Sequence, residues 1–185
     1  MDIRRALLNP LVAASLALGG LTGAPAAAQE VGELLERLAD PELERWQRVE
    51  RQIVSEWSKS GSAAMDLLLR RGRDALAEGD HEAAIEHLTA LVDHAPDFAE
   101  GWNARATAYF ESDRLGPAMH DLRRALALNP DHFGALTGLG SILEETGAYE
   151  RALDAYRAAH DIHPHQPVIG RAVERMERRV YGFDA

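Results

Sequence analysis

Histidines are the residues best suited to chemistry in this chain, and two of them, His81 and His87, flank the segment HEAAIEH. Zinc proteases carry a similar helical motif in which the histidines stand at i and i+4, so that both imidazoles lie on one face. The two histidines here are six residues apart, which turns them by about 240° around a helix. The spacing therefore excludes zinc-protease chemistry.

A second group of histidines, His160, His163 and His165, lies beside Asp161. Imidazole is a common metal ligand, and residues 160 and 163 share a helical face. However, a natural zinc site needs three or four placed ligands, and a histidine near the C-terminus of a helix is favoured by the helix dipole alone. We predict no metal site, with metal binding by this cluster as the alternative.

The rest of the sequence offers few catalytic groups. It has no cysteine, which excludes disulfides, thiol nucleophiles and cysteine-ligated metals. It contains no nucleophile elbow, phosphate-binding glycine loop or dinucleotide fingerprint. We therefore expect a non-catalytic protein with no cofactor.

Acidic residues outnumber basic ones in this chain of 185 residues. There are 30 aspartates and glutamates against 20 lysines and arginines, a formal net charge of −10. Sequence-independent nucleic-acid binding requires a basic surface, so we expect no nucleic-acid partner. Apolar residues make up 46% of the chain, which is enough for a packed core.

Residues 1–28 have the pattern of a signal peptide. Two arginines precede an uncharged run over residues 6–29, whose middle is apolar. The run ends with small residues at Ala26 and Ala28, the −3 and −1 positions that signal peptidase reads, so we expect cleavage before Gln29. The alternative is an uncleaved membrane anchor, since 24 uncharged residues are enough to cross a bilayer. In both cases we expect the remaining chain to face the periplasm.

Self-similarity with a period of 34 residues organises the rest of the sequence. Each unit has two short amphipathic helical patterns joined by a turn, and no segment alternates with period two. A proline ends each unit because it cannot continue the preceding helix, and small residues let the two helices approach closely. The columns are Pro96, Pro130 and Pro164; Ala84, Ala118 and Ala152; Leu88, Leu122 and Tyr156; Leu68, Trp102 and Leu136; and Gly72, Ala106 and Gly140.

This pattern resembles the tetratricopeptide repeat (TPR) family, whose unit reads W-x2-L-G-x2-Y, then A-x3-F, then P. Units 65–98 and 99–132 carry Arg71 and Arg105 where leucine is usual, and we interpret these two arginines as a subtype of the repeat. Unit 133–166 matches at every position. Its matching residues are Leu136, Leu139, Gly140, Leu143, Ala152, Tyr156 and Pro164. The resemblance implies an all-α solenoid of three stacked helix-turn-helix units.

The segments on either side of the repeats are predicted to be helical caps. After Pro167, an apolar stripe that includes Ala172 and Met176 indicates one amphipathic helix. Before the repeats, a helix starts near Asp40 and carries Trp46 and Trp57 on its apolar side. The predicted organisation is a signal peptide (1–28), an N-terminal helical extension (29–62), a region of three repeats (63–166) and a C-terminal capping helix and tail (167–185).

In tetratricopeptide proteins the first helices of the units line a concave groove that binds peptides, and the resemblance implies such a groove here. Chaperone-binding members carry a carboxylate clamp of lysine, asparagine and arginine side chains. Its positions hold Leu69, Arg73, Ala104, Gly134 and Gly138 here, so we do not expect binding of chaperone tails. The groove residues predicted to contact a partner are Arg73, Asn103, Thr107, Phe110, Thr137, Ser141, Arg171 and Arg175.

A row of arginines on the capping helix is the most specific feature of this groove. Arg171 and Arg175 are at i and i+4 and share one face. We expect Glu144 and its neighbour to neutralise Arg178 and Arg179, which leaves Arg171 and Arg175 free to bind an acidic peptide or a C-terminal carboxylate.

These observations predict a non-catalytic periplasmic scaffold that binds another protein or peptide of the cell envelope through the groove. Contact with the membrane is expected only through the signal peptide. The alternative is an accessory subunit that docks on an envelope enzyme through the helix of Trp46 and Trp57.

Overall fold

The computed structural model describes residues 26–182, and this part of the chain forms nine α-helices and no strand. The all-α prediction is therefore confirmed. Most of the predicted signal peptide, residues 1–25, lies outside the described residues. The helices are α1 (Ala26–Leu38), α2 (Trp46–Trp57), α3 (Ala63–Ala77), α4 (His81–His94), α5 (Ala99–Glu111), α6 (Leu115–Leu128), α7 (Phe133–Glu145), α8 (Tyr149–Ile162) and α9 (Pro167–Tyr181).

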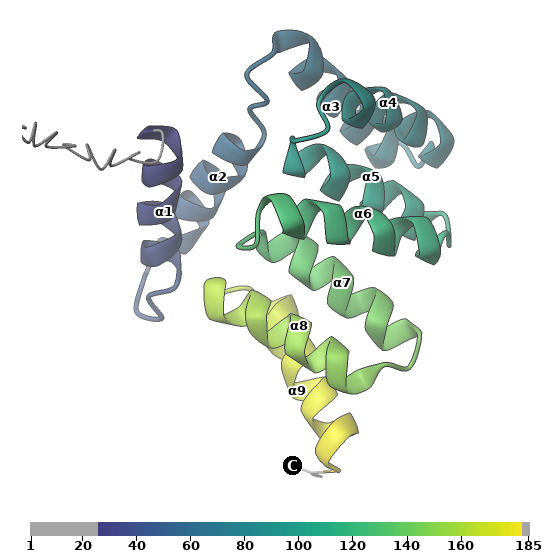
Figure 1. Ribbon diagram of the computed structural model, residues 1–185. Helices are drawn as coiled ribbons and strands as arrows, with labels where there is room; N and C mark the ends of the chain where they lie inside the picture. The colour runs from purple at the N-terminus through teal and green to yellow at the C-terminus, as the bar shows by residue number, and fades with distance from the viewer. Residues whose placement is uncertain (1–25, 183–185) are drawn as a thin grey trace, which may run out of the picture.

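Helices α3 to α8 form three antiparallel pairs that stack into a solenoid, and α9 follows at its C-terminal end (Figure 1). A tight turn joins the two helices of each pair. Gly79 and Gly147 hold a left-handed backbone in the first and third turns, with φ of 76° and 77°, a conformation that glycine adopts without strain. Asp113 adopts the same conformation in the second turn, with φ of 59°.

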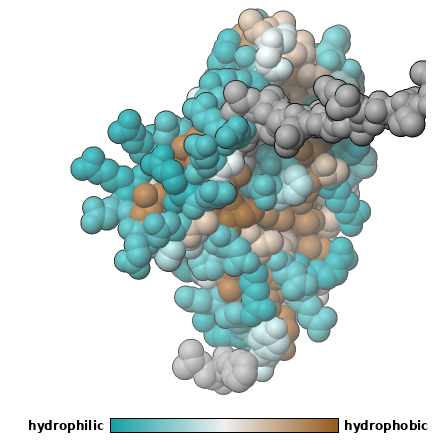
Figure 2. Space-filling view, turned by 60° about the vertical axis from the view of Figure 1, so that its left-hand side comes forward, coloured by the Kyte–Doolittle hydropathy of each residue, from teal (hydrophilic) through white to brown (hydrophobic). Residues whose placement is uncertain are grey.

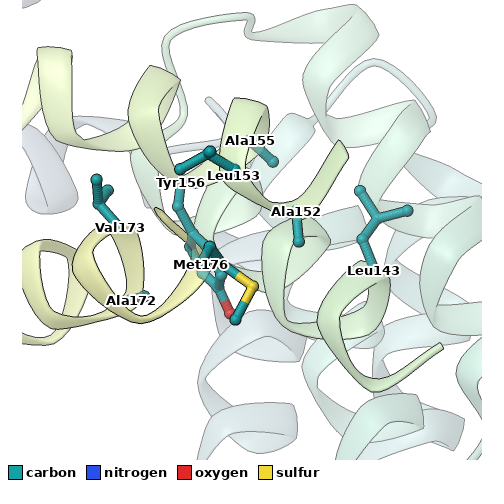
Figure 3. Close-up of a cluster of buried hydrophobic side chains, with 8 residues drawn as sticks. All are labelled: Leu143, Ala152, Leu153, Ala155, Tyr156, Ala172, Val173 and Met176. Atoms are coloured by element: carbon teal, nitrogen blue, oxygen red, sulfur yellow. The ribbon is translucent and has the colours of Figure 1, made fainter. Parts of the chain in front are cut away.

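The column of small residues brings the helices of each pair into close contact, as the sequence predicts. A Cβ atom on Gly140 would lie 2.7 Å from the Tyr156 ring, and one on Gly72 would lie 2.5 Å from Leu88 Cγ. Tyr156 thereby reaches across the α7–α8 pair into a core shared with Met176 of α9 (Figure 3). Packing of this kind couples each unit to its neighbour.

Helix α9 ends the stack because its outer side is polar. It packs on α8 through Ile169 and Met176, which are both buried. Glu174 occupies the repeat position at which the three units carry Gly72, Ala106 and Gly140, and its side chain is exposed. A following helix could not approach that glutamate closely, so α9 is the C-terminal cap that the sequence predicts.

The N-terminal helices do not cap the first repeat, contrary to the prediction. Figure 1 shows α1 and α2 side by side, beside the later repeats, and the C-cap of α2, Ser58, accepts a hydrogen bond from Arg73 of α3. Their apolar side chains, such as Leu38 and Ile53, pack with Phe133 of α7 and Ile162 of α8. The outer side of α3 is left open and carries the exposed Arg71 beside Leu67, whose residue is 38% exposed.

The two arginines that replace leucine therefore serve different purposes and do not define one subtype. Arg71 lies at the open end of the stack. Arg105 lies between two repeats and binds the buried carboxylate of Asp121 through Nε (2.6 Å) and Nη2 (3.0 Å). Its guanidinium also lies 4.9 Å from the centre of the Trp102 ring. The ion pair compensates the charge that each partner would otherwise bury.

We expect Asp121→Ala to lower the free energy of unfolding by about 3–5 kcal/mol, because it leaves the guanidinium of Arg105 without its carboxylate. The double variant Arg105→Leu/Asp121→Ala should recover most of that loss. It installs the leucine and alanine that the third repeat carries at the same positions, Leu139 and Ala155. Urea denaturation of both variants tests this, and a double variant no more stable than Asp121→Ala would contradict it.

Candidate functional site

The concave side of the stack contains a cavity of about 170 Å³ between α5 and α7, here called the α5–α7 pocket. Its lining combines polar side chains with an apolar floor. Four of the predicted groove residues lie together in it, whereas Thr137 does not line it. The lining residues are Asn103, Ala106, Thr107, Phe110, Leu122, Gly134, Gly138, Ser141 and Ile142.

Two glycines, which stand at positions of the absent carboxylate clamp, open the α5–α7 pocket. Gly134 and Gly138 are one helical turn apart on α7 and place no side chain over the floor. A Cβ on Gly138 would already lie 3.3 Å from Leu122. Glycine at both positions was the sequence signal for a cavity, because a bulky residue at either position would fill it.

The hydroxyl groups on the concave side donate their hydrogens to their own helices. Thr107 Oγ1 donates to the Asn103 carbonyl (3.2 Å), and Ser141 Oγ donates to the carbonyl of Thr137 (3.1 Å). Each hydroxyl has one hydrogen and two lone pairs. The pocket wall therefore presents mainly hydrogen-bond acceptors to whatever enters it.

A row of polar side chains connects the α5–α7 pocket to α9. The Tyr156 hydroxyl donates to Glu144 Oε2 at 2.9 Å, and its oxygen lies 3.1 Å from Ser141 Oγ. Arg175 then binds both carboxylate oxygens of Glu144, at 2.6 and 2.7 Å. The hydrogen bond from Arg175 lowers the pKa of Glu144, and burial raises the pKa of Tyr156. The network fixes one wall of the pocket against the cap.

The expectation that Arg175 is free is therefore wrong. Helical side chains lean toward the N-terminus of their helix, and the Tyr156 hydroxyl holds the carboxylate of Glu144 in place. Glu144 consequently binds Arg175 and not the expected Arg178.

On α9, the arginines with neither an ion pair nor a ring contact are Arg171 and Arg178. Neither has an ion-pair partner within residues 26–182. Arg179 lies over the Tyr149 ring, 4.9 Å from its centre, and its charge adds to that of Arg175 in lowering the pKa of Glu144. The free pair on α9 is thus Arg171 and Arg178, seven residues apart on one side of the helix.

Arg73 lies on the concave side, but its charge is engaged within the protein. Its Nη2 binds Glu100 Oε1 at 2.5 Å, and Nη1 donates to Ser58 Oγ at 3.1 Å. His132 donates from Nε2 to Glu100 Oε2 at 2.7 Å and accepts the Ala135 N–H at Nδ1, which caps α7. Burial alone would raise the pKa of Glu100, but His132 and Arg73 outweigh it, and the pKa is lowered.

The tryptophans of α2 contact histidines in the loops between repeats. Trp57 stacks on His132 with a ring-centre distance of 4.5 Å, and Trp46 stacks on His165 at 5.9 Å. The face of α2 that was the alternative docking surface is therefore covered by the chain's own repeats. The sequence indicates that these two tryptophans share a face, because Trp46 and Trp57 are eleven residues apart, about three helical turns.

The histidine cluster of the third repeat serves this packing. His163 is fully buried between Trp46 and Phe133, and its Nε2 lies 3.4 Å from Glu50 Oε1. His165 donates from Nε2 to the Asp40 carbonyl at 2.9 Å. Within residues 26–182, no three histidine, aspartate or glutamate side chains are arranged to hold a metal ion.

The stacked helix pairs and their concave groove define a helical-repeat solenoid. The chain belongs to the tetratricopeptide repeat family, whose model matches residues 69–119 and 118–167. It is 32% identical over 148 residues to a TPR repeat-containing protein of Rhizobium etli, covering 80% of this chain and 72% of that protein. Proteins of this family mediate protein–protein interactions.

Other relatives match over smaller parts of their length. The small glutamine-rich tetratricopeptide repeat-containing protein 2 of Saccharomyces cerevisiae is 29% identical over 63% of this chain, which spans only 33% of that protein.

Solved structures share the fold. The first TPR domain of human RPAP3 superposes with a TM-score of 0.61 at 21% identity, over 64% of this chain and 94% of that domain. MamA superposes with a TM-score of 0.60 at 22% identity, over 75% of this chain and 82% of MamA. Within the described residues, none of the helices is both long and apolar enough to span a bilayer.

We expect the docking of α2 to weaken as the pH falls below about 6.5, the ordinary pKa of histidine. Burial lowers the pKa of His163, more than the nearby Glu50 raises it, and His165 and His160 lower it further. As the pH falls, His163 therefore takes up a proton more readily when α2 is released than when it is docked. The stability of the docked α2 that is present above this pH is lost below it.

Denaturant unfolding at pH 7.5 and 5.5, followed by tryptophan fluorescence in a Trp102→Phe background, measures this effect. His163→Phe should reduce the pH dependence, whereas His94→Gln, which changes an exposed histidine, should leave it intact. An unchanged pH dependence in His163→Phe would contradict the assignment.

Proposed function

We propose that this protein is a non-catalytic scaffold of the cell envelope that binds an extended segment of another protein in the α5–α7 pocket. One observation carries the proposal: two neighbouring repeats build a preformed cavity on the concave side from residues at groove positions. Such a site needs no chemistry of its own. It needs only complementary shape and polar groups that fix the orientation of a ligand.

The chemistry of the pocket favours an extended peptide. Thr107 and Ser141 offer acceptor oxygens along its wall, and these suit the N–H groups of a peptide backbone. Phe110 and Leu122 offer apolar surface for one side chain. The network through Tyr156 holds the wall in place before a ligand arrives, which reduces the ordering cost of binding.

The ligand is expected to differ from a chaperone tail. The first TPR of Spaghetti (RPAP3) has been solved bound to an HSP90 peptide ending in EEVD. In this chain, two of the clamp positions hold the buried Leu69 and Ala104, and a third holds Gly138. These residues cannot bind a carboxylate, so we assign the pocket to an apolar side chain.

The location in the cell envelope rests on the pattern of residues 1–28. Cleavage before Gln29 would leave α1 almost complete, because that helix begins at Ala26. We expect N-terminal sequencing of the protein from an envelope fraction to begin at Gln29. A chain from that fraction that still begins at Met1 or Asp2 would contradict cleavage.

The pocket itself can be tested by filling it. We expect Gly138→Leu to weaken binding of peptides selected from a phage-displayed library of 12-residue peptides by at least about tenfold, which corresponds to about 1.4 kcal/mol. The leucine side chain would occupy the cavity beside Leu122. Fluorescence polarisation with the selected peptides measures the affinity.

Gly116→Leu is the matched control. Gly116 also lies in a helix, but a side chain there would meet nothing within 4 Å. This variant should bind as the unchanged chain does. Equal binding by Gly138→Leu and Gly116→Leu would refute the pocket as the peptide site.

A further inference from the structure

A groove runs along α1 and shares no lining residue with the α5–α7 pocket. It consists of two neighbouring cavities of about 510 and 340 Å³, and three residues line both of them. The side of the molecule that carries α1 and α2 is turned forward in Figure 2, where apolar side chains lie open among hydrophilic ones. We define the α1 groove by six of its lining residues, Gly32, Leu35, Glu36, Trp57, Asp131 and Asp161.

The sequence of α1 explains why a groove forms there. Leu34 and Leu38 stand at i and i+4 and are buried in the core that α1 shares with α2. Gly32, Leu35 and Ala39 follow one another by about one helical turn on the neighbouring ridge, and they line the cavities. A Cβ atom on Gly32 would meet nothing within 4 Å. The missing side chain therefore leaves open the part of the groove that the two cavities share.

Half-buried apolar side chains form the floor of the α1 groove. Leu35 and Trp57 pack against the core that includes Phe133, and both also line the larger cavity. One face of the Trp57 ring lies against His132, with a ring-centre distance of 4.5 Å. The floor thus combines an aliphatic side chain with an indole ring, and guanidinium groups stack on such rings.

Carboxylates complete the lining and make the groove anionic. Glu36, Asp131 and Asp161 are exposed, and no hydrogen bond or ion pair engages their carboxylates within residues 26–182. Lys59 is the one cation among the lining residues of the two cavities, and Glu56 neutralises it at 2.6 Å. The net charge of −10 on the whole chain adds to the attraction of this groove for a cation.

The placement of these charges fits an extended basic segment and not a metal ion. In the part of the chain that the structure describes, no three carboxylate or histidine side chains are arranged to hold a metal ion. Residues 32 to 39 span about 10.5 Å along α1, which is about the length of three residues of extended chain. Arg37, the basic residue of α1, is turned by about 140° from Gly32 around the helix, so its charge lies away from the groove.

We propose that the α1 groove binds a segment of a partner protein that carries an arginine beside an apolar side chain. The guanidinium stacks on Trp57 and pairs with Asp131, and the apolar side chain packs on Leu35. Arginine suits both contacts, because its planar and weakly hydrated guanidinium binds carboxylates through paired hydrogen bonds. The anionic groove repels the phosphates of nucleic acids and of membranes, which favours a protein segment. This inference goes beyond the proposed function and does not depend on the α5–α7 pocket.

The experiment selects 12-residue peptides from a phage-displayed library on the full chain carrying Gly138→Leu, in which the α5–α7 pocket is filled. The selected peptides should carry arginine beside apolar residues. Adding Gly32→Leu should weaken their binding by at least about tenfold, because the leucine occupies the groove. Adding Gly116→Leu is the matched control and should change nothing, since a Cβ at either glycine would meet nothing within 4 Å. Fluorescence polarisation measures the affinities.

The charges of the groove are tested with isosteric amides. Glu36→Gln/Asp131→Asn/Asp161→Asn should weaken binding by about tenfold in about 50 mM NaCl and should reduce the salt dependence. Replacing the arginines of the peptides with citrulline, which removes the charge and keeps the shape, should produce a similar loss. The matched control changes three exposed carboxylates that also lack an ion-pair partner within residues 26–182, and it should bind as its parent chain does. This control is Glu86→Gln/Asp97→Asn/Asp154→Asn.

The remaining outcomes overturn the inference and leave the α5–α7 pocket in place, because that pocket is filled throughout. Selected peptides that lack arginine, or that bind Gly32→Leu and Gly116→Leu equally, would refute the groove as the site of a basic segment. Equal binding by the two triple variants would refute the role of the carboxylates. Spermidine bound as tightly as the peptides, or self-association in sedimentation experiments that Gly32→Leu abolishes, would overturn the assignment to a partner protein.

Discussion

Close contact between paired helices is the constraint on which the rest of this structure depends. A glycine or alanine at one position of each unit allows the facing helix to approach until side chains such as Tyr156 interlock with the next unit. The same position decides where the stack ends, because α9 carries Glu174 there. At the opposite end, α3 presents Arg71 to solvent in place of the usual leucine. A charged side chain thus stands at each end of the solenoid, with Leu67 also exposed beside Arg71.

The N-terminal helices leave the first repeat uncovered and take another position. They pack across the loops between repeats, where Phe133 and Ile162 provide apolar surface and His132 and His163 provide aromatic contacts. This arrangement places α2 along one border of the concave groove. The N-terminal extension therefore shapes the candidate binding surface as well as adding to the core.

The periodic part of the structure could be predicted from the sequence because repeats constrain one another. A proline, an alanine and a small residue recurring every 34 positions specify the helix pairs and their contacts. The place of α1 and α2 could not be predicted in this way, since it depends on contacts between segments more than 70 residues apart, such as Trp57 with His132. No local pattern encodes such a pairing.

In the candidate site, too, the repeat predicts some features and not others. The sequence predicted that residues such as Asn103, Thr107 and Ser141 share the concave side, because their places in the repeat fix their direction. It did not predict which charges are neutralised.

Which charges are neutralised depends on the length of the side chains and on neighbouring residues that hold them in place. The Tyr156 hydroxyl holds Glu144 where it meets Arg175, and Arg171 and Arg178 are left without an ion pair. In this groove Arg175 stabilises the fold, because it fixes the wall of the pocket against the cap, while Arg171 and Arg178 keep their charges unpaired within the described residues.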